Sequence, residues 1–366
     1  MTTENGTAPQ RGIKRTSRAR KVTPDNLTEL QELAPETAEL QIIIIEETAP
    51  EIVPTEAPES EEVTMTAKNR LAEAGRTVMR DFLKKLAESE PIARDGSDPE
   101  GVHDMRVATR RLRAAFQVME ETVWQRKVCR KFRRDLRGLA NALSMVRDSD
   151  VFLQHLDEYL AKQTPEAVGE LAVLREVVVK RRDKGREEMH ERLDSKKTQR
   201  VLEKLEAFLH TLGAGVADAA ADDHEALPVL VSHFAGSAVW RRYEELQAYE
   251  TVLPGDILTL HRLRVAAKRL RYTVGFFEDA LSPEAKTLSK QLSEVQDYLG
   301  DLHDHQVAVD LATNLLKKQP ENPALSQYRA ERILEIARMT EGFGKEWDKV
   351  SGLAFRHSLA TSIAGT

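Results

Sequence analysis

The pattern of apolar and polar positions predicts helices over most of the chain. From Lys68 onward, apolar residues recur every three or four positions, which is the spacing of one face of an α-helix. Gly and Pro stand mainly between these stretches, where N-cap residues precede prolines suited to a first helical turn. This pattern predicts an all-α protein. The predicted helices cover roughly residues 67–90, 99–121, 124–143, 148–162, 166–193, 198–213, 229–249, 256–281, 284–300, 303–318 and 324–350.

The segment before Lys68 has a different character. A basic stretch from Arg11 to Lys21 is followed by many Glu and Pro residues and by no Lys or Arg before Lys68. Such a composition buries too little apolar surface to offset the entropy of ordering, so a disordered tail is predicted, and it could serve an unidentified protein partner. The predicted organisation is a tail at 1–65, a helical domain at 66–350 and a C-terminal tail at 351–366. The helical domain is predicted to have two halves, at about 66–227 and 228–350, with a linker at 214–227.

The helical part contains an internal repeat. Residues 103–113 read HDMRVATRRLR, and residues 261–271, which begin 158 positions later, read HRLRVAAKRLR. A second match, 156 positions apart, relates residues 136–151 to residues 292–307. Because the two separations are nearly equal, they indicate one duplicated unit of several helices, whose halves would be related by a pseudo-twofold axis.

Each copy of the repeat places its basic residues on one helix face. At 100° per residue, the four basic positions of each copy fall within an arc of about 80°, next to an apolar face that is predicted to enter the core. We call the two arcs the cationic stripes. The first consists of His103, Arg106, Arg110 and Arg113, and the second of His261, Arg264, Lys268 and Arg271. The predicted core faces are Met105, Ala108, Leu112, Ala115, Phe116 and Met119, and Leu263, Ala266, Leu270, Val274 and Phe277.

The composition of the stripes favours a bound anion over a solvated helix face. Like charges spaced this closely on a helix repel by about 0.2–0.5 kcal/mol per pair, yet the same register is kept in both copies. Guanidinium groups bind phosphate oxygens in pairs, and a row of cations suits a linear chain of phosphates. The two His residues would donate hydrogen bonds from both ring nitrogens when protonated.

A further basic helix follows the first stripe. Arg126, Arg130, Arg133 and Arg137 fall on one face of it. In the second copy, Lys286 and Lys290 align with Arg130 and Arg134, so these four positions are predicted to line the same site.

Charge, cysteine content and apolar stretches limit the functional classes to which the protein can belong. A net charge of −6 by itself argues against a polyanion binder, but the charges are segregated along the chain. Cys129 is the only cysteine, which excludes an intramolecular disulfide and a cysteine-rich metal site. The sequence contains neither a membrane-spanning apolar stretch nor a signal-peptide core, so a cytoplasmic location with no membrane partner is predicted.

The doubled motif His-x-x-Arg-Val-x-x-Arg/Lys-Arg-Leu-Arg, followed by Leu-x-x-Leu-x-x-x-Arg/His-Asp-x-x-Val, resembles the CHAD (conserved histidine α-helical domain) family over roughly residues 66–350. The resemblance implies two antiparallel four-helix-bundle halves around a basic central channel. It also implies binding of inorganic polyphosphate and association with polyphosphate granules. The implied ligand contacts are the eight stripe residues, with Arg130, Arg134, Lys286 and Lys290 as lining positions. One departure is His303, which stands where the first copy has Arg147.

Two other functions remain open on the sequence alone. A metal-dependent hydrolase of polyphosphate or nucleoside polyphosphates would need carboxylates for Mg²⁺, and Asp148 and Asp304 occupy equivalent positions. At a predicted helix start, such residues are more simply caps or ion pairs. A nucleic-acid binder would share the phosphate contacts, but few aromatic residues accompany the stripes. We therefore expect a non-catalytic protein without metal or cofactor, with nucleic acid disfavoured as a partner.

Overall fold

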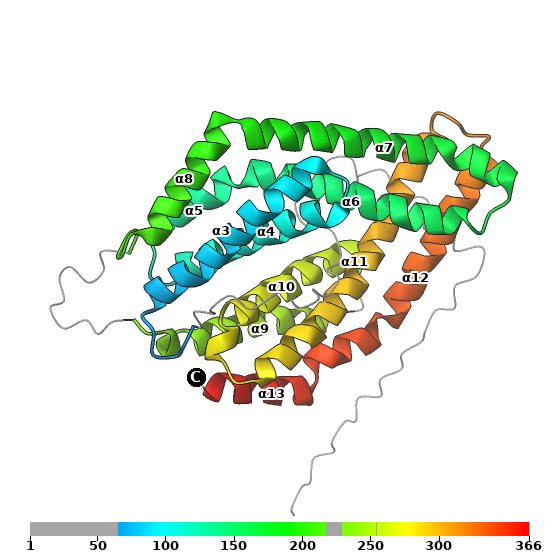
Figure 1. Cartoon of the computed structure of the whole chain (residues 1–366). Coiled ribbons are helices and arrows are strands. Elements are labelled where there is room, and N and C mark those ends of the chain that lie inside the picture. The colour runs from blue at the N-terminus through cyan, green and yellow to red at the C-terminus, as the bar shows by residue number, and fades with distance from the viewer. Residues whose placement is uncertain (1–64, 217–228, 254, 366) are drawn as a thin grey trace, which may run out of the picture. The chain divides into compact units, whose positions relative to one another are not determined.

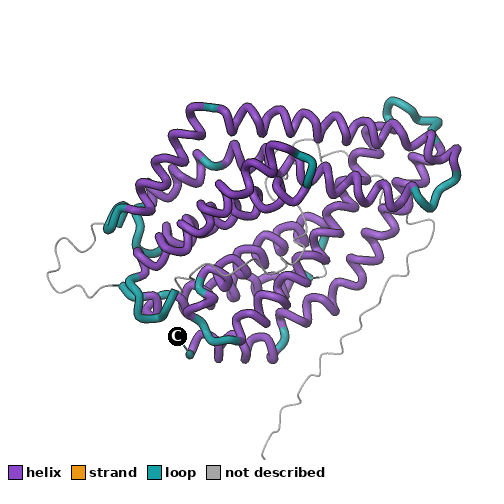
Figure 2. The backbone as a smooth tube through the Cα atoms, in the orientation of Figure 1, coloured by secondary structure: helices purple, strands orange, loops and turns teal. Residues whose placement is uncertain are grey.

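A computed structural model describes residues 65–216, 229–253 and 255–365, and these residues form an all-α fold (Figures 1 and 2). Within this described part there is no β-strand, and the extended contacts are two isolated bridges, Arg70 with Leu230 and Trp124 with Val216. The all-α prediction is confirmed. The predicted N-terminal tail and most of the predicted linker lie outside the described residues.

The helices before the linker form one antiparallel group. α3 lies along α4, α6 lies along α7, and α4 packs against both α5 and α6. The bounds are α3 Leu71–Asp95, α4 Pro99–Glu120, α5 Arg126–Asp135, α6 Arg137–Leu160, α7 Pro165–Asp194 and α8 Lys196–His210.

The helices after the linker form a second group, in which α10 packs on α9 and α11, and α11 lies along α12. The bounds are α9 Ala235–Gln247, α10 Ile257–Phe276, α11 Glu284–Leu316, α12 Pro323–Ser351 and α13 Leu353–Ala364, with short 3₁₀ turns η2 Val231–His233, η3 Ala248–Val252 and η4 Glu278–Ala280.

Helix starts follow the predicted capping signals. The Asp98 side chain accepts a hydrogen bond from the amide of Glu100 at 2.9 Å, at the start of α4. Asp256 accepts one from the amide of Thr259 at 2.7 Å, at the start of α10. Each cap satisfies an amide that has no partner within its own helix.

Three sequence predictions about helix ends are wrong. No break occurs between residues 143 and 148 or between 300 and 303, because α6 and α11 run through both places, and the chain instead breaks at Leu136. The pairs Arg147-Asp148 and His303-Asp304, which the sequence suggested as helix starts, lie in the interiors of these helices. The segment expected to be a C-terminal tail contains α13, whose Phe355 and Leu359 are buried.

One large hydrophobic core joins residues from both groups of helices. It includes every residue of the two predicted core faces, from Met105 on α4 to Phe277 after α10. A smaller cluster lies apart from it, around Leu156, Leu171, Ala312 and Tyr328 of α6, α7, α11 and α12. The core thus fixes the faces that α4 and α10 present, whereas the pseudo-twofold halves and the channel stay predictions.

Candidate functional site

The two helices that carry the cationic stripes pack directly against each other. α4 contacts α10, and the polar faces of both lie beside the core faces that the sequence predicted. Four stripe side chains are buried, and the other four are half-buried. The buried ones are His103, Arg106, Arg264 and Lys268; the half-buried ones are Arg110, Arg113, His261 and Arg271. The stripes are therefore not ordinary solvated helix faces.

Tyr272 joins the two stripes. The guanidinium carbon of Arg110, on α4, lies 5.2 Å from the centre of the Tyr272 ring, and that of Arg271, on α10, lies 5.0 Å from it. The Nε of Arg271 also donates to Oε1 of the buried Gln296 on α11 at 3.1 Å. A cation over an aromatic face is stabilised by the charge distribution of the ring. Sequence reasoning missed Tyr272, although it directly follows the second stripe.

Arg106 is the most deeply buried cation of the stripes, with 3% of its surface exposed. Its Nε and Nη2 atoms are shielded from solvent and make no hydrogen bond within the described part of the chain. Burial lowers the pKa of Arg106 to about 10, with a further contribution from Arg110 and an opposing one from Asp148. The guanidinium thus stays charged at neutral pH, and buried charges of this kind call for an anionic partner.

Asp148 on α6 and Asp304 on α11 meet beside the stripes. Burial and, after it, the neighbouring Asp148 raise the pKa of Asp304 to about 7, and Arg264 and Arg106 oppose this shift. Both residues lie inside long helices, so the prediction that they cap helix starts is wrong. The repeat-equivalent acids instead face the repeat-equivalent arginines.

His303 and Arg147, the pair that departs from a strict repeat, are both buried. The His303 ring centre lies 5.4 Å from that of His261. Burial, with Arg264 and His261 adding to it, lowers the pKa of His303 to about 3, so this ring is neutral at physiological pH. Nη1 of Arg147 lies 3.7 Å from Oε1 of Glu100 at the start of α4.

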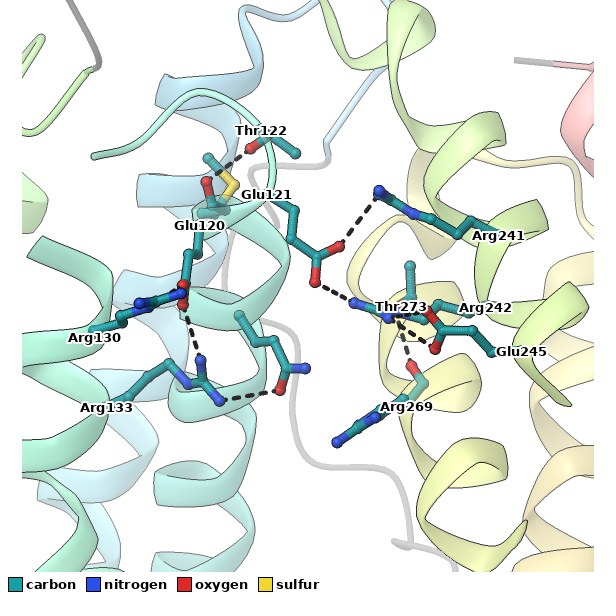
Figure 3. Close-up of polar contacts among 12 residues, drawn as sticks. Glu120, Glu121, Thr122, Arg130, Arg133, Arg241, Arg242, Glu245, Arg269 and Thr273 are labelled. Carbon is teal, nitrogen blue, oxygen red and sulfur yellow. Dashed lines mark hydrogen bonds and ion pairs between the residues drawn. The ribbon is translucent and has the colours of Figure 1, made fainter. Parts of the chain in front are cut away.

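The predicted lining residues outside the stripes are exposed. Arg130 and Arg133 of α5 both bond to the carboxylate of Glu120, with Arg133 Nη1 at 2.9 Å (Figure 3). Arg134 lies 3.8 Å from Asp135. Lys286 and Lys290 lie on the exposed side of α11. The structure therefore brings the two stripe helices together, with Arg110 and Arg271 meeting at Tyr272, and places these four residues on outer faces.

A carboxylate at the end of α4 ties this helix to α9. Glu121 pairs with Arg241 at 3.2 Å and with Arg242, which also bonds to Glu245 (Figure 3). The Arg242 side chain is nearly buried, so this contact is more than a surface ion pair. It holds the end of the first stripe helix against the second group of helices.

One group of side chains in the described residues has the spacing of metal ligands. Atoms of Glu100, His103 and Asp104 that can bind a metal lie within 4.8 Å of one another, with Glu100 and Asp104 exposed. Arg147 already faces Glu100, and its positive charge would oppose a cation there. None of the helices in the described ranges has the length and apolar character needed to cross a membrane.

Comparisons with known proteins agree on the fold. The structure resembles the crystal structure of the CHAD domain from the plant Ricinus communis, with 24% identity, coverage of 83% of this chain and 97% of the other, and a TM-score of 0.63. It also resembles PptA from Streptomyces chartreusis, with 14% identity, coverage of 77% and 99%, and a TM-score of 0.56. No match was found among curated proteins. A family model, the CHAD domain, matches residues 77–313, which is more than half of the chain, and the protein therefore belongs to the CHAD-domain family.

Proposed function

We propose that this protein binds inorganic polyphosphate in a basic channel between α4 and α10, using the two cationic stripes. The observation that carries the proposal is the meeting of the stripes, where Arg110 and Arg271 lie over the one ring of Tyr272. Two rows of cations brought together in this way match a linear polyanion better than a single compact phosphate. The buried Arg106 supports the same reading, since its guanidinium has shielded donors without a hydrogen bond among the described residues.

We further propose that the site is non-catalytic. Hydrolysis of phosphoanhydrides normally uses Mg²⁺ held by carboxylates. Asp148 and Asp304 are repeat-equivalent carboxylates beside the stripes, and both lie close to guanidinium groups that oppose a divalent cation. These carboxylates serve better to balance charge in the absence of the ligand. In this reading, the protein sequesters or organises polyphosphate, and association with polyphosphate granules follows from that role.

Nucleic acid is the main competing polyanion. Its phosphates would meet the same cations, but single strands gain much of their affinity by stacking bases on aromatic side chains. Within the described residues, Tyr272 is the aromatic side chain that contacts both stripes, and its face is covered by two arginines. A phosphate chain without bases therefore fits the site better.

One experiment tests these proposals together. Long-chain polyphosphate, single-stranded RNA and duplex DNA compete for the full chain at physiological salt, and phosphate release is followed in the same samples with Mg²⁺. We expect polyphosphate to displace both nucleic acids, with no phosphate released. Equal affinity for all three polyanions would refute the specific polyphosphate proposal. Phosphate release that Asp148→Asn abolishes would refute the non-catalytic one.

A further inference from the structure

A cavity lies between α6, α7, α11 and α12, and Tyr272 does not line it. Its volume is about 400 Å³, which is within the range of small-molecule sites. Its lining runs from Asp148 and Asp304 to Tyr159, near the end of α6, and Tyr328, near the start of α12. None of the eight stripe residues lines it. The cavity therefore adjoins the stripes at Asp148 and Asp304 but is lined by residues other than the eight stripe residues.

Arg332 is the central cation of this cavity. Its guanidinium carbon lies 5.2 Å from the ring centre of Tyr159 and 5.3 Å from that of Tyr328, and the two rings meet edge to face at 4.9 Å. Nε of Arg332 is shielded from solvent and has no hydrogen bond in the described residues. Two aromatic rings thus hold the Arg332 guanidinium in place in the lining of the cavity, and it forms no ion pair with a carboxylate of the described residues.

Further cations line the cavity. Arg181 from α7 and Lys162, which follows α6, are among its lining residues, and neither forms an ion pair with a carboxylate of the described residues. Burial and the adjacent Arg332 lower the pKa of His305 to about 4, so His305 acts as a neutral hydrogen-bonding group. These cations suit the anionic group of a ligand.

The rest of the lining disfavours a bare phosphate as the natural ligand, because it is partly apolar and partly acidic. Part of the lining is apolar and would stay uncovered by an inorganic anion. Another part carries carboxylates, including Glu158 and Asp301, which accept hydrogen bonds from hydroxyl or amino groups. The apolar lining consists of Val151, Phe152, Val178, Val307, Ala308 and Leu311.

We propose that this cavity binds a mononucleotide, with its phosphate on Arg332 and Arg181 and its base against the apolar wall. The sugar hydroxyls and base amino groups would donate to Glu158 and Asp301. A nucleotide supplies an anion, hydrogen-bond donors and a flat ring, which are the three chemistries that the walls present. The proposal does not depend on polyphosphate binding at the stripes.

The test is calorimetric titration of the full chain with AMP and GMP at physiological salt. We expect saturable one-to-one binding of at least one nucleotide, weakened at least tenfold by Arg332→Gln. Arg329→Gln is the matched control, because Arg329 lies on the same helix and does not line the cavity. Val307→Phe should also weaken binding, by filling the cavity without changing charge.

Several outcomes would overturn the proposal. These are no binding of either nucleotide, equal binding of adenosine, equal binding of ribose 5-phosphate, or an equal loss in Arg329→Gln. A variant with Arg106→Gln and Arg264→Gln should keep its nucleotide affinity. Loss of that affinity would instead place the nucleotide in the stripes. Thermal unfolding of each variant confirms that a loss of binding is not a loss of fold.

Discussion

Asp304 is the residue whose ionisation most directly changes the charge beside the stripes. Its pKa is raised to about 7 by burial and by Asp148, so it gains a proton as pH falls from 8 to 6. Protonation removes a negative charge that balances Arg264. Because the pKa of Asp304 is higher in the folded state, protonation of Asp304 stabilises the folded protein. This stabilisation is fully present below the usual carboxyl pKa of 3.8 and is lost as pH rises through about 7.

We therefore predict tighter polyphosphate binding at pH 6 than at pH 8, by about fivefold, because one charge near the ligand contributes on the order of 1 kcal/mol. In Asp304→Asn, the affinity at pH 8 should rise and the pH dependence should shrink. Equilibrium binding across this range measures both. A pH dependence that is unchanged in the variant would assign the effect to His103 and His261 instead.

Tyr272 offers a second test at the scale of one side chain. Tyr272→Leu removes the ring under Arg110 and Arg271, whereas Tyr272→Phe keeps it. Since a cation over a ring contributes about 0.5–2 kcal/mol, the Leu variant should bind polyphosphate roughly three- to thirtyfold more weakly. The Phe variant should remain close to the wild type. Equal losses in both would mean that the hydroxyl, and not the ring, matters.

At the scale of the helix, the sequence predicted the faces of α4 and α10 but not the lengths of α6 and α11. The stripes and core faces follow from helical periodicity, which depends on local spacing alone. Polar residues such as Asp148 and His303 are read locally as helix ends, but they are stable in helix interiors because the other helices supply partners or burial. Tyr272 and the cavity around Arg332 arise from packing between distant segments, which no local pattern contains.

The stripes themselves predict a large and selective effect on binding. A variant with Arg106→Ala and Arg264→Ala removes one buried guanidinium from each motif helix. Charged hydrogen bonds contribute about 1.5–3 kcal/mol each, so affinity for polyphosphate should fall at least a hundredfold. Lys196→Ala with Lys197→Ala, which removes two exposed cations from α8, is the matched control and should change affinity little. Similar losses in the two variants would indicate binding by general surface charge.

The contact of α4 with α9 predicts a stability effect. Glu121→Gln removes the charge that pairs with Arg241 and the nearly buried Arg242. The free energy of unfolding in urea should fall by about 2 kcal/mol, as for other charged hydrogen bonds. Glu88→Gln is the control, because its pair with Lys84 spans 3.9 Å between exposed side chains. Equal stability of the two variants would make the Glu121 contact an ordinary surface pair.

At the scale of the whole molecule, one core links the helices that carry both stripes. Because residues of α4 and α10 belong to the same hydrophobic core, the two stripes cannot separate without exposing it. A ligand that spans both stripes binds only the arrangement in which α4 and α10 are packed. Polyphosphate should therefore stabilise the folded protein to the extent that it binds the stripes of both helices at the same time.

This coupling predicts a single thermal unfolding transition whose midpoint rises with polyphosphate. At a ligand concentration a hundred times Kd, the added stability is about 2.7 kcal/mol. The shift should nearly vanish in the variant with Arg106→Ala and Arg264→Ala, and short chains that reach one stripe should stabilise less than long ones. Calorimetry with chains of graded length measures this. Equal shifts from short and long chains would show that one stripe suffices, and the channel between the two helices would then not be the binding site.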